Sequence, residues 1–185
     1  GVVDFYSHAL KAGVKPILGV ELYVAPGSRF DKSGGAGGSA NHLTLLARDE
    51  AGYRNLVKLT SAANIDGFYY KPRVDKELLR AHSAGLIALS GCLKGEVAQK
   101  ALRGDDAGAL KAAGEFNEIF GAGNYYFELM VNGLAEQEKT NRALLALSKS
   151  AGIPVVATND CHYLRQEDAP VHEVLLCIST GKTLQ

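Results

Sequence analysis

The chain has 185 residues, 46% of them hydrophobic and 22% charged, which is ordinary composition for one globular domain with its own core. Twenty basic residues balance twenty acidic ones, so the sequence lacks the basic excess of a domain that grips duplex DNA through its phosphates. It also contains no apolar run near the length of about 20 residues that crosses a membrane, and no basic segment followed by an apolar one that would mark a signal peptide.

Short β-rich segments alternate with helical ones, which predicts an α/β fold. The N-terminal half predicts a helix over 1–12, a strand over 16–24, a strand over 42–47, a helix over 50–63 and a short helix over 74–82. Residues 25–41 are expected to form a flexible loop, because Gly34, Gly35, Gly37 and Gly38 do not favour regular structure. Residues 67–72 predict an aromatic loop.

The C-terminal half predicts a strand over 86–90, helices over 95–102 and 106–120, a strand over 125–129, a helix over 135–150, a strand over 153–158 and a helix over 167–178. Five strands, mostly separated by helices, indicate part of a barrel or a doubly wound sheet in a single domain over residues 1–185. In such folds the functional groups gather where strands end. The candidate site residues are therefore sought at strand ends.

The sharpest local signal is Thr158-Asn159-Asp160-Cys161-His162, directly after the expected strand 153–158. Asp160 and His162 are two residues apart, so in an extended chain they project to the same side. A carboxylate and an imidazole at a strand end suit a divalent metal ion. An Asx turn followed by a surface histidine is the structural alternative.

Three further residues carry metal-binding chemistry at strand ends or inside strands. Glu21 is a carboxylate in an otherwise apolar strand, so it must be paired, coordinated or turned to solvent. Cys92 follows Ser90-Gly91, where glycine permits close backbone approach, although a free cysteine is commonly a small buried apolar residue. His42 begins an apolar strand and could equally be a satisfied histidine at a sheet edge. For His42 to join the others, that strand must run the other way or the preceding loop must fold back.

Other polar residues rank lower. Glu128 lies inside a strand and is expected to support the site or to pair in a salt bridge. His8, His82 and His172 are expected to be structural. Lys71 and Arg73, beside the tyrosines of the aromatic loop, are expected to be solvated unless they contact a phosphate or stack on a base. Neither a phosphate-binding Gly-Lys-Ser/Thr loop nor a Gly-x-Ser-x-Gly elbow is present. From the residues alone, a metal-dependent hydrolase is the best interpretation.

The sequence resembles the PHP (polymerase and histidinol phosphatase) domain family, in the form found in bacterial DNA polymerase III alpha subunits. The resemblance covers nearly the whole chain. It rests on residues 13–28, 42–47, 67–73, 90–92, 157–163, 172–178 and 180–184, which occur in linked order.

This resemblance implies a partial, distorted (β/α)7 PHP barrel, with about five of seven strands present. It implies a cluster of two or three divalent metal ions, zinc, manganese or iron, at the open end of the intact domain. Five of the family's nine ligand positions match Glu21, His42, Cys92, Asp160 and His162, of which Asp160 and His162 are also expected to be catalytic. The other four would come from a His-x-His strand and an Asp-His turn that the family places before Gly1, so the chain is expected to be a truncated fragment.

The resemblance also implies a function. The parent protein is expected to be a cytoplasmic DNA-directed DNA polymerase that contacts DNA and other subunits of the replicative holoenzyme, without a membrane. This domain is expected to be a metal-dependent phosphoesterase, most simply a 3′–5′ proofreading exonuclease, and the fragment alone to be inactive. The alternatives are a metal-binding structural or interaction module of the polymerase and a stand-alone PHP phosphatase.

Overall fold

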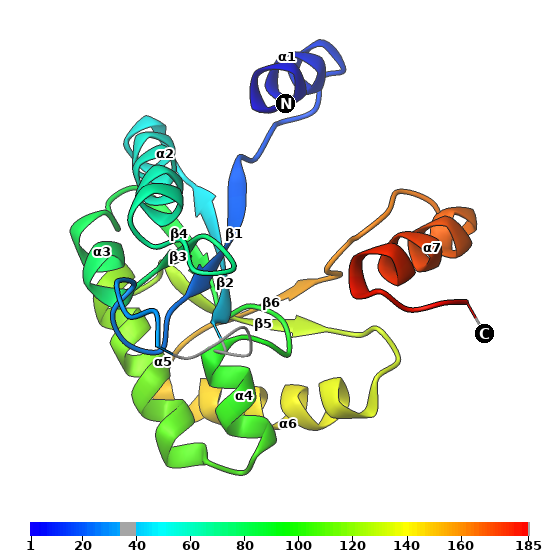
Figure 1. The fold of residues 1–185 in the computed structure, drawn as a ribbon. Coiled ribbons are helices and arrows are strands. Elements are labelled where there is room, and N and C mark those ends of the chain that lie inside the picture. Colours follow the sequence, from blue (N-terminus) through cyan, green and yellow to red (C-terminus); the bar gives the residue numbers. More distant parts are fainter. Residues whose placement is uncertain (34–39, 185) are drawn as a thin grey trace.

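The computed structural model describes residues 1–33 and 40–184, and it shows an α/β fold built on a six-stranded mixed sheet (Figure 1). The strands follow the order β3-β1-β2-β4-β5-β6 across the sheet. Their bounds are β1 Gly19–Val24, β2 Asn41–Ala47, β3 Arg73–Val74, β4 Leu86–Leu89, β5 Tyr125–Met130 and β6 Val155–Thr158. This arrangement confirms the predicted α/β class and agrees with part of a PHP barrel.

Strand direction changes within the sheet. β2 is antiparallel to both of its neighbours, β1 and β4, whereas β1 pairs with β3, β4 with β5, and β5 with β6 in parallel. The beginning of β2 therefore lies at the same edge as the ends of β1 and β4. One of the two routes that the sequence left open for His42 is thus the one observed: its strand runs the other way.

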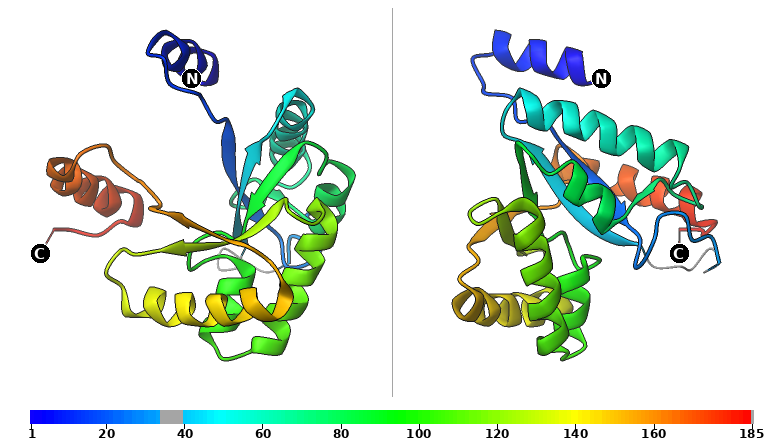
Figure 2. Two further views of the ribbon diagram at one scale, coloured as in Figure 1. Left: turned by 180° about the vertical axis from the view of Figure 1, so that it is seen from behind. Right: turned by 90° about the vertical axis from the view of Figure 1, so that its left-hand side faces the viewer.

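Helices cover the sheet in two groups (Figure 2). α2 lies beside β1, β2 and β3, and α4, α5 and α6 pack together, with α5 beside β4 and β5 and α6 beside β5. α3 contacts α5. The helices are α1 Val2–Lys11, α2 Glu50–Ile65, α3 Lys76–Ala81, α4 Glu96–Leu102, α5 Asp106–Phe120, α6 Ala135–Ala151 and α7 Ala169–Thr180, with a 3-10 turn η1 at Gln166–Asp168. No helix among the described residues has both the length and the apolar character needed to cross a membrane.

Alternation along the strands sets which side chains enter the core. In β1, Leu22 and Val24 are buried, and in β2 so are Leu43 and Leu45, and these four belong to one apolar cluster with residues of α2. The residues between them face the opposite side of the sheet. In β5, Tyr125 is fully buried, and its ring stacks on Phe116 of α5 with centroids 5.6 Å apart. The core thus occupies the helix-covered side, and the other side is free for polar groups.

Aspartate residues cap the starts of three helices. The side chains of Asp49, Asp75 and Asp105 accept hydrogen bonds of 2.9 Å from the backbone N–H groups three residues ahead, at the starts of α2, α3 and α5. Such caps satisfy N–H groups that have no partner inside the helix. They explain why the starts of α2 and α5 match the sequence prediction closely.

Several predicted boundaries need correction. β3 was not predicted, because two residues are too short for an alternating pattern, and α3 therefore begins at Lys76 instead of residue 74. β1 begins at Gly19, so residues 16–18 are not part of the strand, and α7 begins at Ala169, after η1. The predicted flexibility at Gly34, Gly35, Gly37 and Gly38 falls outside the described residues.

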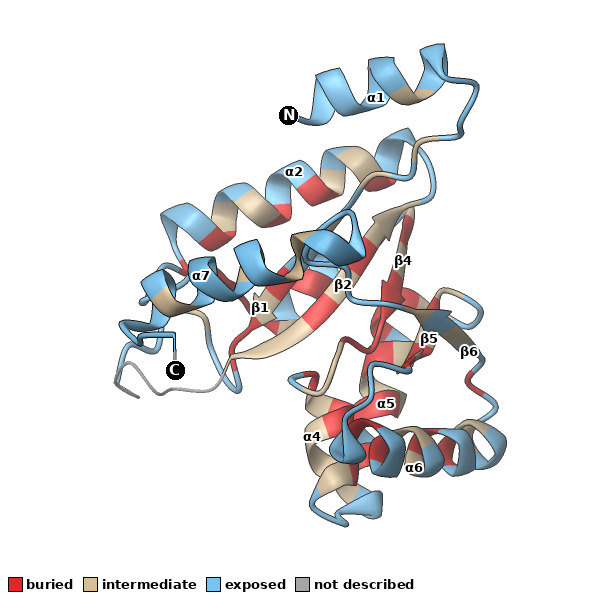
Figure 3. Ribbon diagram, turned by 90° about the vertical axis from the view of Figure 1, so that its right-hand side faces the viewer, coloured by how far each residue is buried: buried red, intermediate tan, exposed pale blue. Residues whose placement is uncertain are grey.

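The helices at the two ends of the chain pack little against the rest. No residue of α1 or α7 is buried (Figure 3). α1 is joined to β1 by an extended segment, and α7 lies beyond the end of β6 (Figure 1). The core is therefore formed by the elements between β1 and β6.

Candidate metal centre

The polar face of β1 and β2 supplies two of the predicted ligands. Glu21 and Tyr23 alternate with the buried Leu22 and Val24, so they lie on the face away from the helices. Tyr23 is directly opposite His42 in the antiparallel pairing, which places His42 on that same face. As a result, the imidazole of His42 reaches the carboxylate of Glu21, and the two form an ion-pair contact through Nδ1 and Oε1.

A glycine allows Cys92 to approach this pair. Gly91 follows β4 with a φ of +82°, a conformation that side chains rarely adopt. A Cβ at this position would lie 2.6 Å from the backbone oxygen of His42. Only glycine therefore fits between β4 and the start of β2, and the turn it makes brings Cys92 beside His42.

The three donors converge on one point. Ligand atoms of Glu21, His42 and Cys92 all lie within 4.8 Å of one another. The Cys92 Sγ is 3.6 Å from Nδ1 of His42, the same nitrogen that contacts Glu21. Donors that share one zinc ion at bonds of about 2.0–2.3 Å must lie within about 5 Å of each other, so this spacing fits a metal ion. A set of one nitrogen, one oxygen and one sulfur suits a borderline cation such as zinc.

The surroundings of Cys92 favour its protonated form in the metal-free chain. Burial raises the pKa of the Cys92 thiol, and the negative charges of Asp160 and Glu21 raise it further. A backbone hydrogen bond from Lys94 and its positive charge oppose this rise. Because a thiolate is the form that binds metal, a cation at this point would compete with the thiol proton, and its binding would release that proton.

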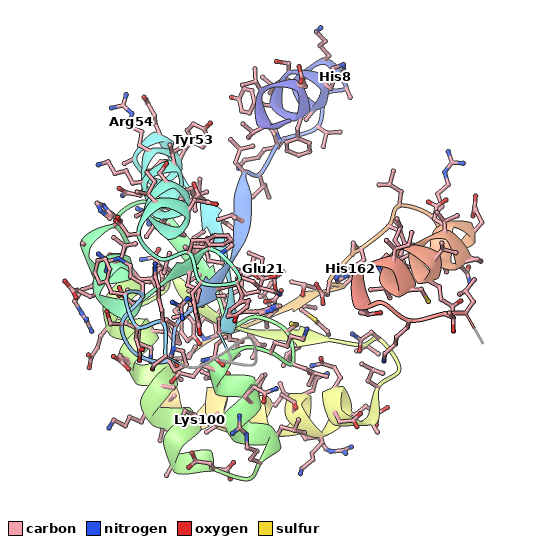
Figure 4. All side chains as sticks on the ribbon, viewed as in Figure 1. His8, Glu21, Tyr53, Arg54, Lys100 and His162 are labelled. Carbon is pink, nitrogen blue, oxygen red and sulfur yellow. The ribbon has the colours of Figure 1, made fainter. Side chains whose placement is uncertain are left out.

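Asp160 and His162 do not belong to this group of three. Asp160 has a φ of +51°, so the chain turns after β6 instead of continuing as the extended segment that the spacing suggested. The His162 Nδ1–H donates a 2.7 Å hydrogen bond to the Asp160 backbone oxygen, which leaves Nε2 as the free acceptor. His162 lies beside α7, away from Glu21 (Figure 4). The negative charge of Asp160 nevertheless contributes to the raised pKa of Cys92 and of Glu128.

Glu128, inside β5, is hydrogen-bonded to residues that follow β4 and to the last residue of β6. It is only 4% exposed, and its carboxylate accepts a 3.0 Å bond from the Gly91 N–H and a 2.7 Å bond from the Thr158 hydroxyl. Its own N–H donates to the Ser90 hydroxyl. Burial raises the pKa of Glu128, although the bonds from Thr158 and Gly91 oppose the rise. The sequence predicted a supporting role or a salt bridge for Glu128, and the structure shows hydrogen bonds to Gly91, Ser90 and Thr158.

Two neighbours of the predicted ligands were missed. His172, expected to be structural, has its ring 5.5 Å from that of His162 and 5.3 Å from that of Tyr163. The Tyr23 ring meets that of His42 edge-on at 5.0 Å. An aromatic residue two positions after Glu21 was a visible signal for Tyr23. Nothing local pointed to His172, because its contact depends on how α7 follows the turn after β6.

Comparisons with known proteins agree with this architecture. A family model described as "PHP domain" matches residues 1–132. The DNA polymerase III subunit alpha of Thermus aquaticus is 50% identical over 186 residues, those of Deinococcus radiodurans and Mycobacterium leprae are 47% and 43% identical, and each alignment covers 100% of this chain. The chain spans only 14–17% of the length of these relatives.

Proposed function

Because the chain belongs to the PHP domain family, and is homologous along its whole length to a region of DNA polymerase III alpha subunits, we propose that it forms the metal-dependent phosphoesterase domain of such a polymerase. The convergence of Glu21, His42 and Cys92 within 4.8 Å carries the proposal. A donor set of this kind, on the polar face of a sheet otherwise packed against helices, is a costly arrangement for a fold that needs only a core.

The five predicted ligands would have different roles in the site. Glu21, His42 and Cys92 hold a first divalent ion, zinc, manganese or iron, and Asp160 and His162 complete or extend the site to two or three ions. A divalent ion bound here would supply an activated water molecule and positive charge for the phosphate oxygens. His162 offers Nε2, because its Nδ1–H is held by the Asp160 backbone oxygen. Asp160 and His162 are the residues that we expect to be catalytic.

The proposed reaction is 3′–5′ removal of nucleotides from a DNA end, which serves proofreading in the parent polymerase. In this setting the parent protein performs DNA-directed DNA synthesis, lies in the cytoplasm, and contacts DNA and the other subunits of the replicative holoenzyme. All three cysteines of the chain are free, as suits a reducing compartment. The balanced formal charge implies that DNA reaches this domain mainly through other parts of the parent protein.

Metal binding is the first test. We expect the chain to bind zinc or manganese in a calorimetric titration, and His42→Gln and Cys92→Ser to weaken that affinity by at least about tenfold, because each removes a ligand. His8→Gln is the matched control, since His8 is exposed on α1. In the full polymerase, Asp160→Ala and His162→Ala should abolish metal-dependent excision of a mismatched 3′ end. Unchanged metal affinity in His42→Gln would refute the site, and unchanged excision in Asp160→Ala would refute the exonuclease.

A second candidate function is a metal-binding module that braces the polymerase or docks another subunit without its own chemistry. The position of His162 favours it, because that residue lies apart from the three converging donors. Metal titration and the excision assay together distinguish this module from a hydrolase. Tight metal binding with no excision in the wild-type polymerase would support the module, whereas loss of excision in step with loss of metal would support the hydrolase.

A further inference from the structure

The aromatic loop between α2 and β3 has an unusual backbone. Tyr70 has a φ of +56°, and together with Asp160 it is one of two described non-glycine residues with positive φ. The Tyr69 N–H donates to the Lys71 oxygen at 3.0 Å, so the chain reverses tightly around Tyr70. A glycine would adopt this conformation without strain, yet the position holds a large aromatic residue. Strain of this kind at an exposed tip points to a role for the side chain outside folding.

Burial does not explain the aromatic residues at this tip. The side chain of Tyr70 is 62% exposed and that of Phe68 is 52% exposed. The Tyr70 ring meets the ring of Tyr69 edge-on, with centroids 4.7 Å apart. Two large rings are therefore presented to solvent on one short loop, with an exposed lysine, Lys71, directly after them.

This loop is linked to the metal-ligand cluster through Tyr23. The Lys71 Nζ donates a 3.1 Å hydrogen bond to the Tyr23 hydroxyl and lies 4.3 Å from the centroid of the Tyr23 ring. That ring in turn lies edge-on to His42, with centroids 5.0 Å apart. The ammonium group of Lys71 is thus separated from the cluster by a single aromatic ring. A chain of phosphates and bases that reached the cluster would meet Lys71 and the tip of the loop next.

We propose that Phe68, Tyr70 and Lys71 form a binding platform for the single-stranded end of a nucleic acid. The exposed rings stack on unpaired bases, and the Lys71 ammonium contacts a backbone phosphate, while the terminal phosphodiester lies at Glu21, His42 and Cys92. The inference rests on the proposed function, because it takes that cluster as the place where the strand is cut. It adds the residues that select an unpaired strand, since bases inside a duplex do not expose their faces to such rings.

Binding is measured apart from cleavage, with the 185-residue chain in a chelator and a fluorescent single-stranded DNA oligonucleotide in an anisotropy titration. Tyr70→Gly removes the ring and relieves the positive φ, so we expect its melting temperature to be equal or higher. Its affinity for the oligonucleotide should fall about tenfold, the effect of losing one stacked base. Lys71→Gln should make the salt dependence of binding shallower. The negative slope of log affinity against log salt concentration should decrease in magnitude by about 0.7, as for one lost phosphate contact on a single strand.

Tyr6→Ala on α1 and Lys58→Gln on α2 are the matched controls, because both residues are exposed and lie outside the platform. Both should bind like wild type, and a blunt duplex should bind wild type more weakly than the single strand does. Wild-type affinity in Tyr70→Gly and Lys71→Gln, or no affinity of wild type for the single strand, would overturn the platform. Weakened binding in both variants, together with no metal-dependent cleavage by the wild-type polymerase, would retain the platform and refute the hydrolase.

Discussion

Glu128 connects the buried part of the molecule to the proposed metal centre. Glu128→Ala would leave the Gly91 N–H and the Thr158 hydroxyl without their acceptor. An unpaired buried group costs about 1–3 kcal/mol, and the Gly91 N–H is buried while the Thr158 hydroxyl is part-buried, so we expect the free energy of unfolding to fall by about 3 kcal/mol. Glu128→Gln keeps one acceptor oxygen and should lose about half as much. Denaturant unfolding of the metal-free proteins measures both, and equal stability of the two variants would contradict the role of these bonds.

Residue chemistry predicted much of the candidate site, but not its shape. Glu21 and Cys92 were identifiable because a carboxylate inside an apolar strand and a cysteine after a strand-ending glycine both need a reason. In the structure Gly91 makes a tight turn that approaches the His42 backbone closely. At Asp160 the sequence left an extended segment and a turn with a surface histidine both open, because an aspartate with positive φ has the same sequence signature as one in an extended strand, and the structure has the turn.

At the level of elements, two glycines inside helices have different surroundings. The same substitution to alanine therefore tests tight packing at one position and helix propensity at the other. In α2, a Cβ on Gly52 would lie 1.9 Å from the backbone oxygen of Gly85, whereas in α5 a Cβ on Gly114 would meet nothing within 4 Å. Gly52→Ala should therefore lower the free energy of unfolding by about 1–3 kcal/mol through overpacking. Gly114→Ala should raise it by up to about 1 kcal/mol, because alanine favours the helix more than glycine does.

Thermal and denaturant unfolding of these two variants beside wild type gives the comparison. The same substitution in two helices should change stability in opposite directions. If Gly52→Ala and Gly114→Ala lowered the free energy of unfolding by similar amounts, the close packing of Gly52 against Gly85 would not explain the loss in Gly52→Ala.

Elements with a strong local signal were predicted well, and those made by long-range pairing were not. The predicted starts of α2 and α5, which aspartates cap in the structure, agree with the observed ones, and so do the predicted ends of β1 and β2. β3 consists of two residues, and it exists because Arg73 and Val74 pair in parallel with Tyr23 and Val24. No periodicity can be read from two residues, so that strand and the sixth place in the sheet were beyond a sequence argument.

At the scale of the whole molecule, stability should be uneven along the chain. α1 and α7 have 10 and 12 residues and no buried side chain, and helices of that length are marginal in water without packing. We expect amide hydrogens of both helices to exchange near the unfolded rate, whereas those of α5, with buried Ala113 and Phe116, should exchange only through global unfolding.

Hydrogen exchange followed by mass spectrometry, at several protein concentrations, tests this expectation. Protection of α1 or α7 equal to that of α5 at every concentration would contradict it. Protection that increases with concentration would show instead that these helices, with apolar residues such as Phe5 and Ile178 exposed, associate between copies of the chain.

The pairing of β2 between β1 and β4 also bears on when the metal-ligand cluster can exist. His42 lies 21 residues after Glu21 and 50 residues before Cys92, and the three meet only once both antiparallel pairings have formed. Contacts between such distant segments form slowly, because their loops must close first. During synthesis, then, a chain that has not yet reached Cys92 has no complete set of donors to offer. We therefore expect the metal ion to bind only after this half of the sheet has assembled. The ion would then stabilise the folded sheet without directing its formation.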